Sequence, residues 1–210
     1  MFKTNGSFPT TYLDFINESI TNAMGTNITG KKILEIGDND TTYDLNDFVK
    51  RGMVHTLLEP CKMNDDGTIG APYMLNLGQN YIPKVLEDAA NLSEYMNYFD
   101  VITNIGCLEH IEPVEVQYEI WKNLHNMLKV GGVMIHIMPD DEECDKYLRW
   151  LGHCHLYFQM AFYENLVDKL GYEIVHNDLL NFNRSVALKK TTASTFNLNK
   201  EEFLALITIR

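Results

Sequence analysis

The chain is poor in basic residues and cysteine, and it lacks a long apolar run. Its 17 lysine and arginine residues face 29 acidic ones, which gives a formal net charge of −12. Nucleic-acid backbones are bound by clusters of Lys and Arg, so this balance disfavours a nucleic-acid partner and favours a small or neutral one. The longest apolar run, around Val133 to Met138, has the length of a strand and is too short to cross a membrane.

Other signals that direct a chain to a compartment or a scaffold are also missing. The four cysteines (Cys61, Cys107, Cys144 and Cys154) lie far apart and form no C-x-x-C pair, which favours reduced thiols over a disulfide or zinc framework. The N-terminal residues MFKTNGSFPTTY have neither the basic start nor the apolar stretch of a secretory signal. We therefore expect a cytoplasmic protein with no membrane partner.

The 210 residues contain no repeat, low-complexity tract or Pro/Gly-rich linker, and 45% of them are hydrophobic. This composition fits one globular domain over 1–210. Short β-rich runs alternate with helical stretches, which is typical of an α/β protein whose parallel sheet is covered on both faces. We divide the domain into an N-terminal helical segment (1–30), a core (31–189) and a tail helix (190–210).

Periodicity and turn residues predict the elements of this core. They are a helix over Thr11–Met24, strands over Ile33–Ile36, Val54–Pro60 and Phe99–Ile105, a helix over Glu112–Leu128 stopped by Gly131-Gly132, a strand over Val133–Pro139, a helix over Phe162–Leu170 ended by Gly171, and strands over Tyr172–His176 and Arg184–Lys189. The last two strands are so close in sequence that they should pair antiparallel. In the tail, Asn199 and Glu202 have the spacing of a capping box, and the following LALITI run would be sticky if exposed, which makes a homodimer a candidate assembly.

Five segments in this order resemble the class I S-adenosylmethionine-dependent methyltransferases, in particular their small-molecule branch. They are ILEIGDND, LLEP, FDVITNIGCLEHIE, LKVGGVMIHIMPD and GHCHLYFQMAFYENLVDKLGYEIV, and they span most of the chain. The resemblance implies a Rossmann-like, doubly wound, mostly parallel seven-stranded sheet with an antiparallel C-terminal hairpin. It also implies that the cofactor S-adenosyl-L-methionine binds at the carboxyl edge of this sheet and leaves as S-adenosyl-L-homocysteine.

The resemblance assigns cofactor-binding roles to residues that follow the predicted strands. These residues are Glu35, Gly37, Asp38, Asn39 and Asp40 in the first loop, Glu59 and Pro60 after the second strand, Asp88 and Ala89 near adenine, and Asn104, Ile105 and Gly106 beside the methionine moiety. In the first loop the family normally has E-x-G-x-G-x-G, whereas this chain keeps only the first glycine. Asparagine is the residue that best replaces glycine in the left-handed region, and acidic neighbours suit the cationic cofactor. Glu59 should bind the ribose hydroxyls, although an exposed loop acid is the alternative.

Three histidines are candidates for the base that takes a proton from the acceptor. His110 belongs to the L-E-H segment, where a structural role is the alternative, and His153 and His155 share a face of an extended stretch. An H-x-H pair near the acidic run Asp140 to Glu143 is also half of a metal site in some proteins, but we expect no metal here. Nearby aromatic residues are either walls of an acceptor site or core (Tyr147, Trp150, Tyr157, Phe158, Phe162 and Tyr163).

These features predict an enzyme of EC class 2.1.1 that methylates a hydroxyl of a small molecule or glycan. A catalytically inactive, methyltransferase-like binding module is the alternative that the missing glycines favour. A Rossmann-type dehydrogenase is disfavoured, because the chain has no G-x-G-x-x-G turn.

Overall fold

The computed structural model describes residues 12–37, 46–58, 62–63, 69–70, 80–82, 86, 92–140, 142, 156–180 and 183–209. Its centre is a seven-stranded sheet in the order β5-β2-β1-β6-β7-β10-β9. The strands are β1 (Lys32–Ile36), β2 (Val54–Leu58), β5 (Asn80–Ile82), β6 (Phe99–Ile105), β7 (Leu128–Pro139), β9 (Tyr172–Leu180) and β10 (Asn183–Lys190). Only β10 runs against its neighbours β7 and β9, and the other pairs are parallel. The predicted mostly parallel sheet with a C-terminal antiparallel hairpin is therefore confirmed.

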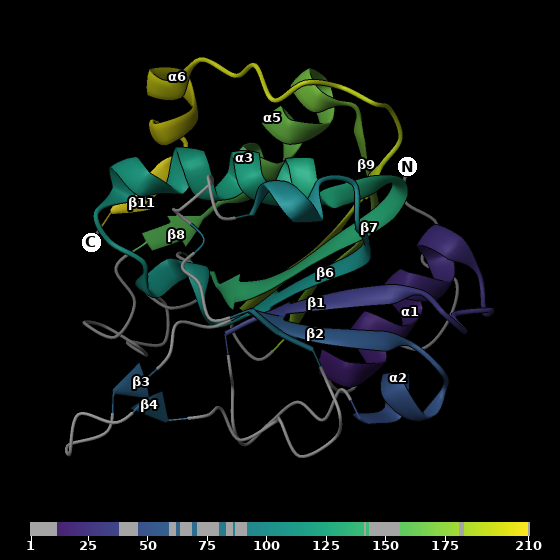
Figure 1. The fold of residues 1–210 in the computed structure, drawn as a ribbon. Coiled ribbons are helices and arrows are strands. Elements are labelled where there is room, and N and C mark those ends of the chain that lie inside the picture. The colour runs from purple at the N-terminus through teal and green to yellow at the C-terminus, as the bar shows by residue number, and fades with distance from the viewer. Residues whose placement is uncertain are drawn as a thin grey trace.

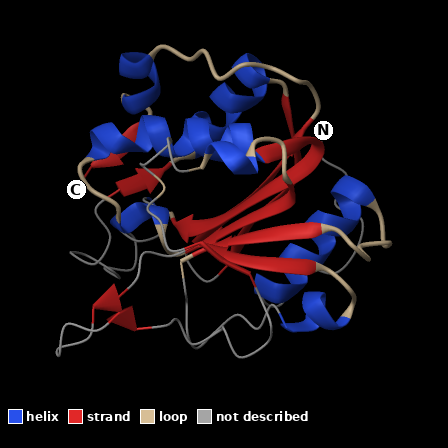
Figure 2. Ribbon diagram, viewed as in Figure 1, coloured by secondary structure: helices blue, strands red, loops and turns tan. Residues whose placement is uncertain are grey.

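Helices cover both faces of this sheet, so its central strands are largely buried and rich in apolar residues (Figures 1 and 2). The helices α1 (Tyr12–Met24) and α2 (Asn46–Lys50) lie on one face. On the other face lie α3 (Gln117–Met127), α5 (Met160–Leu170) and α6 (Lys200–Leu204). Each face has its own apolar cluster, with Phe15 and Ile135 in the first and Trp121 and Phe162 in the second. No helix among the described residues combines the length and apolarity needed to span a membrane.

The remaining described elements are short. They are the small strands β3 (Lys62–Met63), β4 (Ile69–Gly70), β8 (Leu156–Phe158) and β11 (Ile207–Ile209), and the 3₁₀ turns η3 (Ser93–Tyr95), η4 (Leu108–His110) and η5 (Val114–Val116). The turn η4 follows β6 directly and contacts β7 and β8. These contacts bring the L-E-H segment to the carboxyl end of the central strands.

The predicted tail helix is wrong for most of its length. Only Lys200–Leu204 is helical, and Asn199 caps this turn by accepting a hydrogen bond from the backbone N–H of Glu202 at 3.0 Å. The following residues Ile207–Ile209 form β11, which pairs antiparallel with β8. Two of the three β11 residues are β-branched isoleucines and the third is threonine, which suits a strand better than a helix once a partner edge is available.

The sequence suggested that the Gly131-Gly132 pair ends the preceding helix, and the structure shows that it does not. The helix ends at Met127, and β7 begins at once with Leu128 opposite Phe99. The register with β6 then shifts, so that Val133 lies opposite Val101. Gly131 has a φ of +82°, and a Cβ on Gly132 would lie 2.8 Å from the carbonyl oxygen of Asp100. The two glycines therefore form a bulge in which the backbone passes close to β6.

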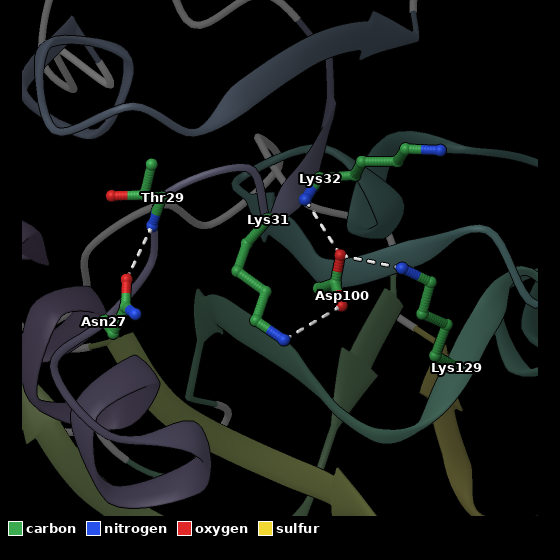
Figure 3. Close-up of polar contacts among 6 residues, drawn as sticks. All are labelled: Asn27, Thr29, Lys31, Lys32, Asp100 and Lys129. Atoms are coloured by element: carbon green, nitrogen blue, oxygen red, sulfur yellow. Dashed lines mark hydrogen bonds and ion pairs between the residues drawn. The ribbon is translucent and has the colours of Figure 1, made fainter.

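Asp100, at the start of β6, ties the amino ends of three strands together (Figure 3). Its Oδ2 atom accepts hydrogen bonds of 2.9 Å from the backbone N–H of Lys32 in β1 and from Nζ of Lys129 in β7, and Lys31 lies 3.6 Å from Oδ1. Burial raises the pKa of Asp100, but these hydrogen bonds and the two ammonium groups outweigh it, so the pKa lies below its ordinary value. The charged cluster therefore belongs to the amino end of the sheet, opposite the edge where open α/β folds bind ligands.

Candidate functional site

Two glycines mark the carboxyl edge of the sheet. Gly37 follows β1 and Gly106 follows β6, with φ values of +76° and +63°. The N–H of Gly37 donates to the carbonyl of Leu58 and that of Gly106 to the carbonyl of Ile137, each at 3.0 Å. A Cβ on Gly37 would lie 2.8 Å from Sγ of Cys107, so the turns after β1 and β6 touch each other. The predicted residues Gly37 and Gly106 are thus brought together, and both require glycine-like backbone conformations.

Asn104, another predicted cofactor-binding residue, lies at the end of β6 and is fully buried. Its Oδ1 atom accepts a hydrogen bond of 3.1 Å from the N–H of Leu108 and thereby fixes the start of η4. Its Nδ2 atom has no hydrogen-bond partner among the described residues. Ile105 completes the strand and is buried at the same edge. A buried amide with an unused N–H at a ligand-binding edge fits a site that a polar ligand completes.

Glu35 lies in β1 and is held by a residue that sequence reasoning missed. The Nε2 atom of His55 in β2 lies 2.8 Å from Oε2 of Glu35, and both residues are buried. His55 pairs with Ile33 in the parallel register, so it lies on the same face as Glu35, one strand away. The signal in the sequence was His55 itself, a polar residue inside the buried strand VHTLL. The polar atoms of such a residue need a buried partner.

Several predicted site residues lie outside the described part of the chain. They are Asp38, Asn39, Asp40, Glu59, Pro60, Asp88, Ala89, His153 and His155. Their roles therefore stay predictions. Within the described residues, no group of three or more His, Cys, Asp or Glu side chains could hold a metal ion. Asp140, from the acidic run after β7, forms an ion pair with Arg184 of β10, with both Nε and Nη2 2.6 Å from Oδ2.

The L-E-H segment forms the turn η4, in which Glu109 and His110 have opposite environments. His110 is exposed, whereas Glu109 is buried with 1% of its surface accessible. The side chain of Gln117, at the start of α3, holds this turn by donating to the carbonyls of Leu108 and Ile111 at 2.9 and 3.0 Å. Burial raises the pKa of Glu109 to about 7 against a lowering by its own backbone N–H. We missed Glu109 in the sequence because an acid beside a histidine is usually the more exposed of the two.

Of the aromatic residues predicted as walls of an acceptor site or as core, some are buried in the core and others lie outside the described residues. Tyr157, Phe158, Phe162 and Tyr163 are all at most 2% exposed and belong to the apolar layer, whereas Tyr147 and Trp150 lie outside the described residues. Trp121 of α3 packs on His136 of β7 with ring centroids 4.5 Å apart, and burial lowers the pKa of His136 to about 3. The burial of the four described aromatic residues therefore favours a role in the core over a role in an acceptor site. The buried hydroxyl of Tyr163 is the one polar group of these side chains that the inference below uses.

Together, the doubly wound sheet and a carboxyl edge built from Gly37, Asn104 and Gly106 define a Rossmann-like ligand-binding α/β protein. A family model described as a methyltransferase domain matches residues 11–177. The chain therefore belongs to the methyltransferase domain family. It is an S-adenosylmethionine-dependent methyltransferase of EC class 2.1.1, with S-adenosylmethionine as its cofactor.

Solved structures share this fold at low sequence identity. One is a 1,6-didemethyltoxoflavin-N1-methyltransferase from Burkholderia thailandensis with bound 1,6-didemethyltoxoflavin and S-adenosylhomocysteine (TM-score 0.56, 14% identity, 78% of this chain and 72% of that one). Another is an O-methyltransferase family protein from the same organism (TM-score 0.60, 14% identity, 83% and 55%). A third is a protein from Pyrococcus horikoshii (TM-score 0.58, 14% identity, 87% and 96%). A comparison with curated proteins gives no match.

Proposed function

We propose that the chain is an O-methyltransferase that acts in the cytoplasm on a hydroxyl group of a small molecule or sugar. The observation that carries the choice of a small acceptor is the net charge of −12 on a chain of a methyltransferase family, because an acidic protein repels polyanionic acceptors. A solved structure with the same fold binds a small heterocyclic compound together with the demethylated cofactor, which is consistent with this choice.

The described carboxyl edge fits the cofactor in two respects. The positive φ of Gly37 and Gly106 lets the backbone turn sharply beside a ligand, and the buried Nδ2 of Asn104 offers an unused hydrogen-bond donor. In the proposal, Glu35 and the 37–40 loop hold the amino-acid part of the cofactor. Glu59 with Pro60 holds the ribose, Asp88 with Ala89 the adenine, and residues 104–106 the methionine moiety. When bound, the cofactor supplies a methyl group activated by its sulfonium sulfur.

The chain's own contribution is to orient the acceptor and to take its proton. A hydroxyl oxygen is a weak nucleophile until a base removes its proton during attack, which is the role proposed for His155 or His153. His110, the third candidate, is exposed at the end of η4, which makes it the weakest of the three for work in a site that excludes water.

Isothermal titration calorimetry with S-adenosylmethionine and S-adenosylhomocysteine is the first experiment. We expect saturable binding of both, and no binding at millimolar ligand would contradict the proposed function. Candidate hydroxyl compounds, phenols and sugars are then screened by mass spectrometry for a gain of one methyl group. Amines serve as the contrasting class of acceptor. If only amines were methylated, the acceptor atom would be nitrogen and the proposed O-methylation would be wrong.

With an acceptor in hand, His155→Ala and His153→Ala separate binding from catalysis. The variant that removes the base should bind S-adenosylhomocysteine normally and lose activity by about a hundredfold or more. His110→Ala tests the third candidate, and because this histidine is exposed we expect little change in activity. Full activity in both the 153 and the 155 variants would contradict a base at either of these positions, and full activity in all three variants would contradict a histidine base.

A further inference from the structure

A buried acid lies beside the proposed cofactor-binding edge, and one of its carboxylate oxygens has no partner among the described residues. Glu109 is in η4, three residues after Gly106, and only 1% of its surface is accessible. Its own backbone N–H bonds to the carboxylate, but its Oε2 atom has no hydrogen-bond partner among the described residues. A buried carboxylate oxygen without a donor costs free energy, so a position that keeps one is a candidate for contact with a ligand.

The side chains around Glu109 include no free cation within the described residues. Arg184 is the nearby cation, and its guanidinium group forms an ion pair with Asp140 through two contacts of 2.6 Å. His136 of β7 is neutral, because burial lowers its pKa to about 3. The buried titratable side chains of β8 and α5 are the phenols of Tyr157 and Tyr163, and His110 of the same turn is exposed.

The hydroxyl of Tyr163 is a second unsatisfied polar group in the same place. It is fully buried and has no hydrogen-bond partner among the described residues. Burial raises the pKa of Tyr163, the charge of Arg184 opposes this rise, and the charges of Glu109 and Asp140 add to it, so all three groups act on this phenol. Two oxygens that have no partner among the described residues are thus within electrostatic range of each other, one in η4 after β6 and one in α5.

In the proposed function, the acceptor binds next to this pair. The cofactor's methionine moiety is expected beside residues 104–106, and η4 continues from there toward β7 and β8. In the proposed function, Glu109 is therefore close to the methyl group that is transferred. His110, the neighbouring residue of the L-E-H segment, is exposed instead.

We propose that Glu109, with Tyr163 beside it, binds the nucleophilic group of the methyl acceptor. The carboxylate accepts a hydrogen bond from the hydroxyl or amine that is to be methylated and so holds the lone pair of that group toward the methyl carbon. As the bond to this carbon forms and the carbon–sulfur bond of the cofactor breaks, the proton passes to Glu109 and from there to the histidine base. The proposal rests on the proposed methyl transfer and adds the residues that contact the acceptor.

The proposal restricts the class of acceptor. A carboxylate in a buried site attracts groups that donate hydrogen bonds and repels anions, because no neighbouring cation offsets its charge. Neutral hydroxyl groups and amines are therefore favoured, whereas carboxylate and phosphate acceptors are excluded. An internal water molecule is the competing explanation, since such waters satisfy buried polar groups in many proteins.

The test uses two cofactor analogues, which need no knowledge of the acceptor. Sinefungin carries an amine in place of the transferred methyl group, and S-adenosylhomocysteine carries nothing there. The ratio of their affinities, measured by calorimetry, therefore reports the charge that faces the methyl position. For the wild-type chain we expect sinefungin to be preferred by about tenfold at pH 8, as for a charge-assisted hydrogen bond. The preference should fall toward pH 6 as Glu109 is protonated.

Three variants make the test specific. Glu109→Gln should keep its affinity for S-adenosylhomocysteine and lose both the preference for sinefungin and its pH dependence. Tyr163→Phe should reduce the preference but keep the pH dependence, because the carboxylate remains. Glu115→Gln makes the same chemical change at an exposed acid of η5 and should behave like the wild type.

The outcomes separate this inference from the proposed function. Failure of the wild-type chain to bind either analogue would contradict the proposed function itself. Binding of both analogues with equal affinity at every pH would overturn only the role of Glu109 and would favour the internal water. A preference that survives in Glu109→Gln, or a pH dependence that disappears in Tyr163→Phe, would also overturn it.

Discussion

His55 and Glu35 form a buried pair across neighbouring strands, with Nε2 of the histidine 2.8 Å from Oε2 of the acid. Both residues are at most 5% exposed, so water cannot replace either partner. An ionised carboxylate only accepts hydrogen bonds, so the tautomer of His55 that carries its proton on Nε2 is the one that matches an ionised Glu35. The pair holds a predicted cofactor-binding acid in place from the strand next to it.

Removal of His55 should destabilise the chain. In His55→Ala the buried carboxylate loses a donor, and we expect a loss of about 3 kcal/mol in the free energy of unfolding. His55→Gln keeps an N–H at a comparable reach and should lose clearly less. Urea denaturation at pH 7 measures both variants. Equal losses in the two would show that the volume of the side chain matters and its hydrogen bond does not.

The contact between Gly37 and Cys107 predicts an unequal response of two glycines to the same substitution. Gly25 and Gly37 both have positive φ, of +82° and +76°. A Cβ on Gly25 would meet nothing within 4 Å, whereas a Cβ on Gly37 would lie 2.8 Å from Sγ of Cys107. Gly25→Ala should therefore cost about 1 kcal/mol of backbone strain, and Gly37→Ala should cost more because the contact is added.

A double-mutant cycle isolates that contact. Cys107→Ala removes the sulfur atom, so part of the extra cost of Gly37→Ala should disappear in the Gly37→Ala, Cys107→Ala double variant. Strictly additive losses in thermal or urea unfolding would mean that the two turns after β1 and β6 do not press on each other. The single Gly37→Ala variant should also bind S-adenosylhomocysteine more weakly, since this turn belongs to the proposed cofactor site.

The buried acid Glu109 predicts a dependence of stability on pH. Its pKa is raised from 4.5 to about 7 in the folded chain. The unfolded chain therefore releases this proton first, and the contribution of Glu109 to stability is fully present below about pH 4.5 and is lost as the pH rises to about 7. A shift of this size corresponds to about 3 kcal/mol.

Glu109→Gln should remove this contribution, so its stability relative to the wild type should increase steadily from pH 4.5 to pH 7. Urea unfolding at half-unit pH intervals gives the difference between the two curves. Glu115→Gln, in which an exposed acid is changed, should run parallel to the wild type. A constant difference between Glu109→Gln and the wild type across this range would show that Glu109 titrates normally in the folded chain.

Most of the sheet was predictable because its strands carry their own signals. KILEI, VHTLL and FDVITNI have apolar residues on both faces, as is typical of strands buried between two helical layers. The short link before Arg184 predicted an antiparallel hairpin, and β9 and β10 form one. Gly171, with a φ of +68°, ends α5 as expected. These features depend on local sequence alone.

The errors arose where a distant partner decides the structure. The sequence predicts that Ile207–Ile209 is the end of a helix, whereas in the structure these residues pair with the edge of β8 as a strand. The sequence predicts that Gly131-Gly132 ends a helix, whereas in the structure the pair forms a bulge in β7 that lies against the backbone of Asp100. Neither partner can be seen from the residues beside these segments, because the contacts join parts of the chain that are far apart in sequence.

The sequence by itself determined the class of protein, the succession of most strands and helices along the core, and the positions of Glu35, Gly37 and Asn104–Gly106 at strand ends. Only the tertiary structure decided the environments of these residues. Burial turned Glu109 into an acid with a pKa of about 7 and left its neighbour His110 exposed, although the two are adjacent in the L-E-H segment. Solvation and charge at a site depend on what packs over each side chain, and in this fold β7, β8 and α5 supply that cover.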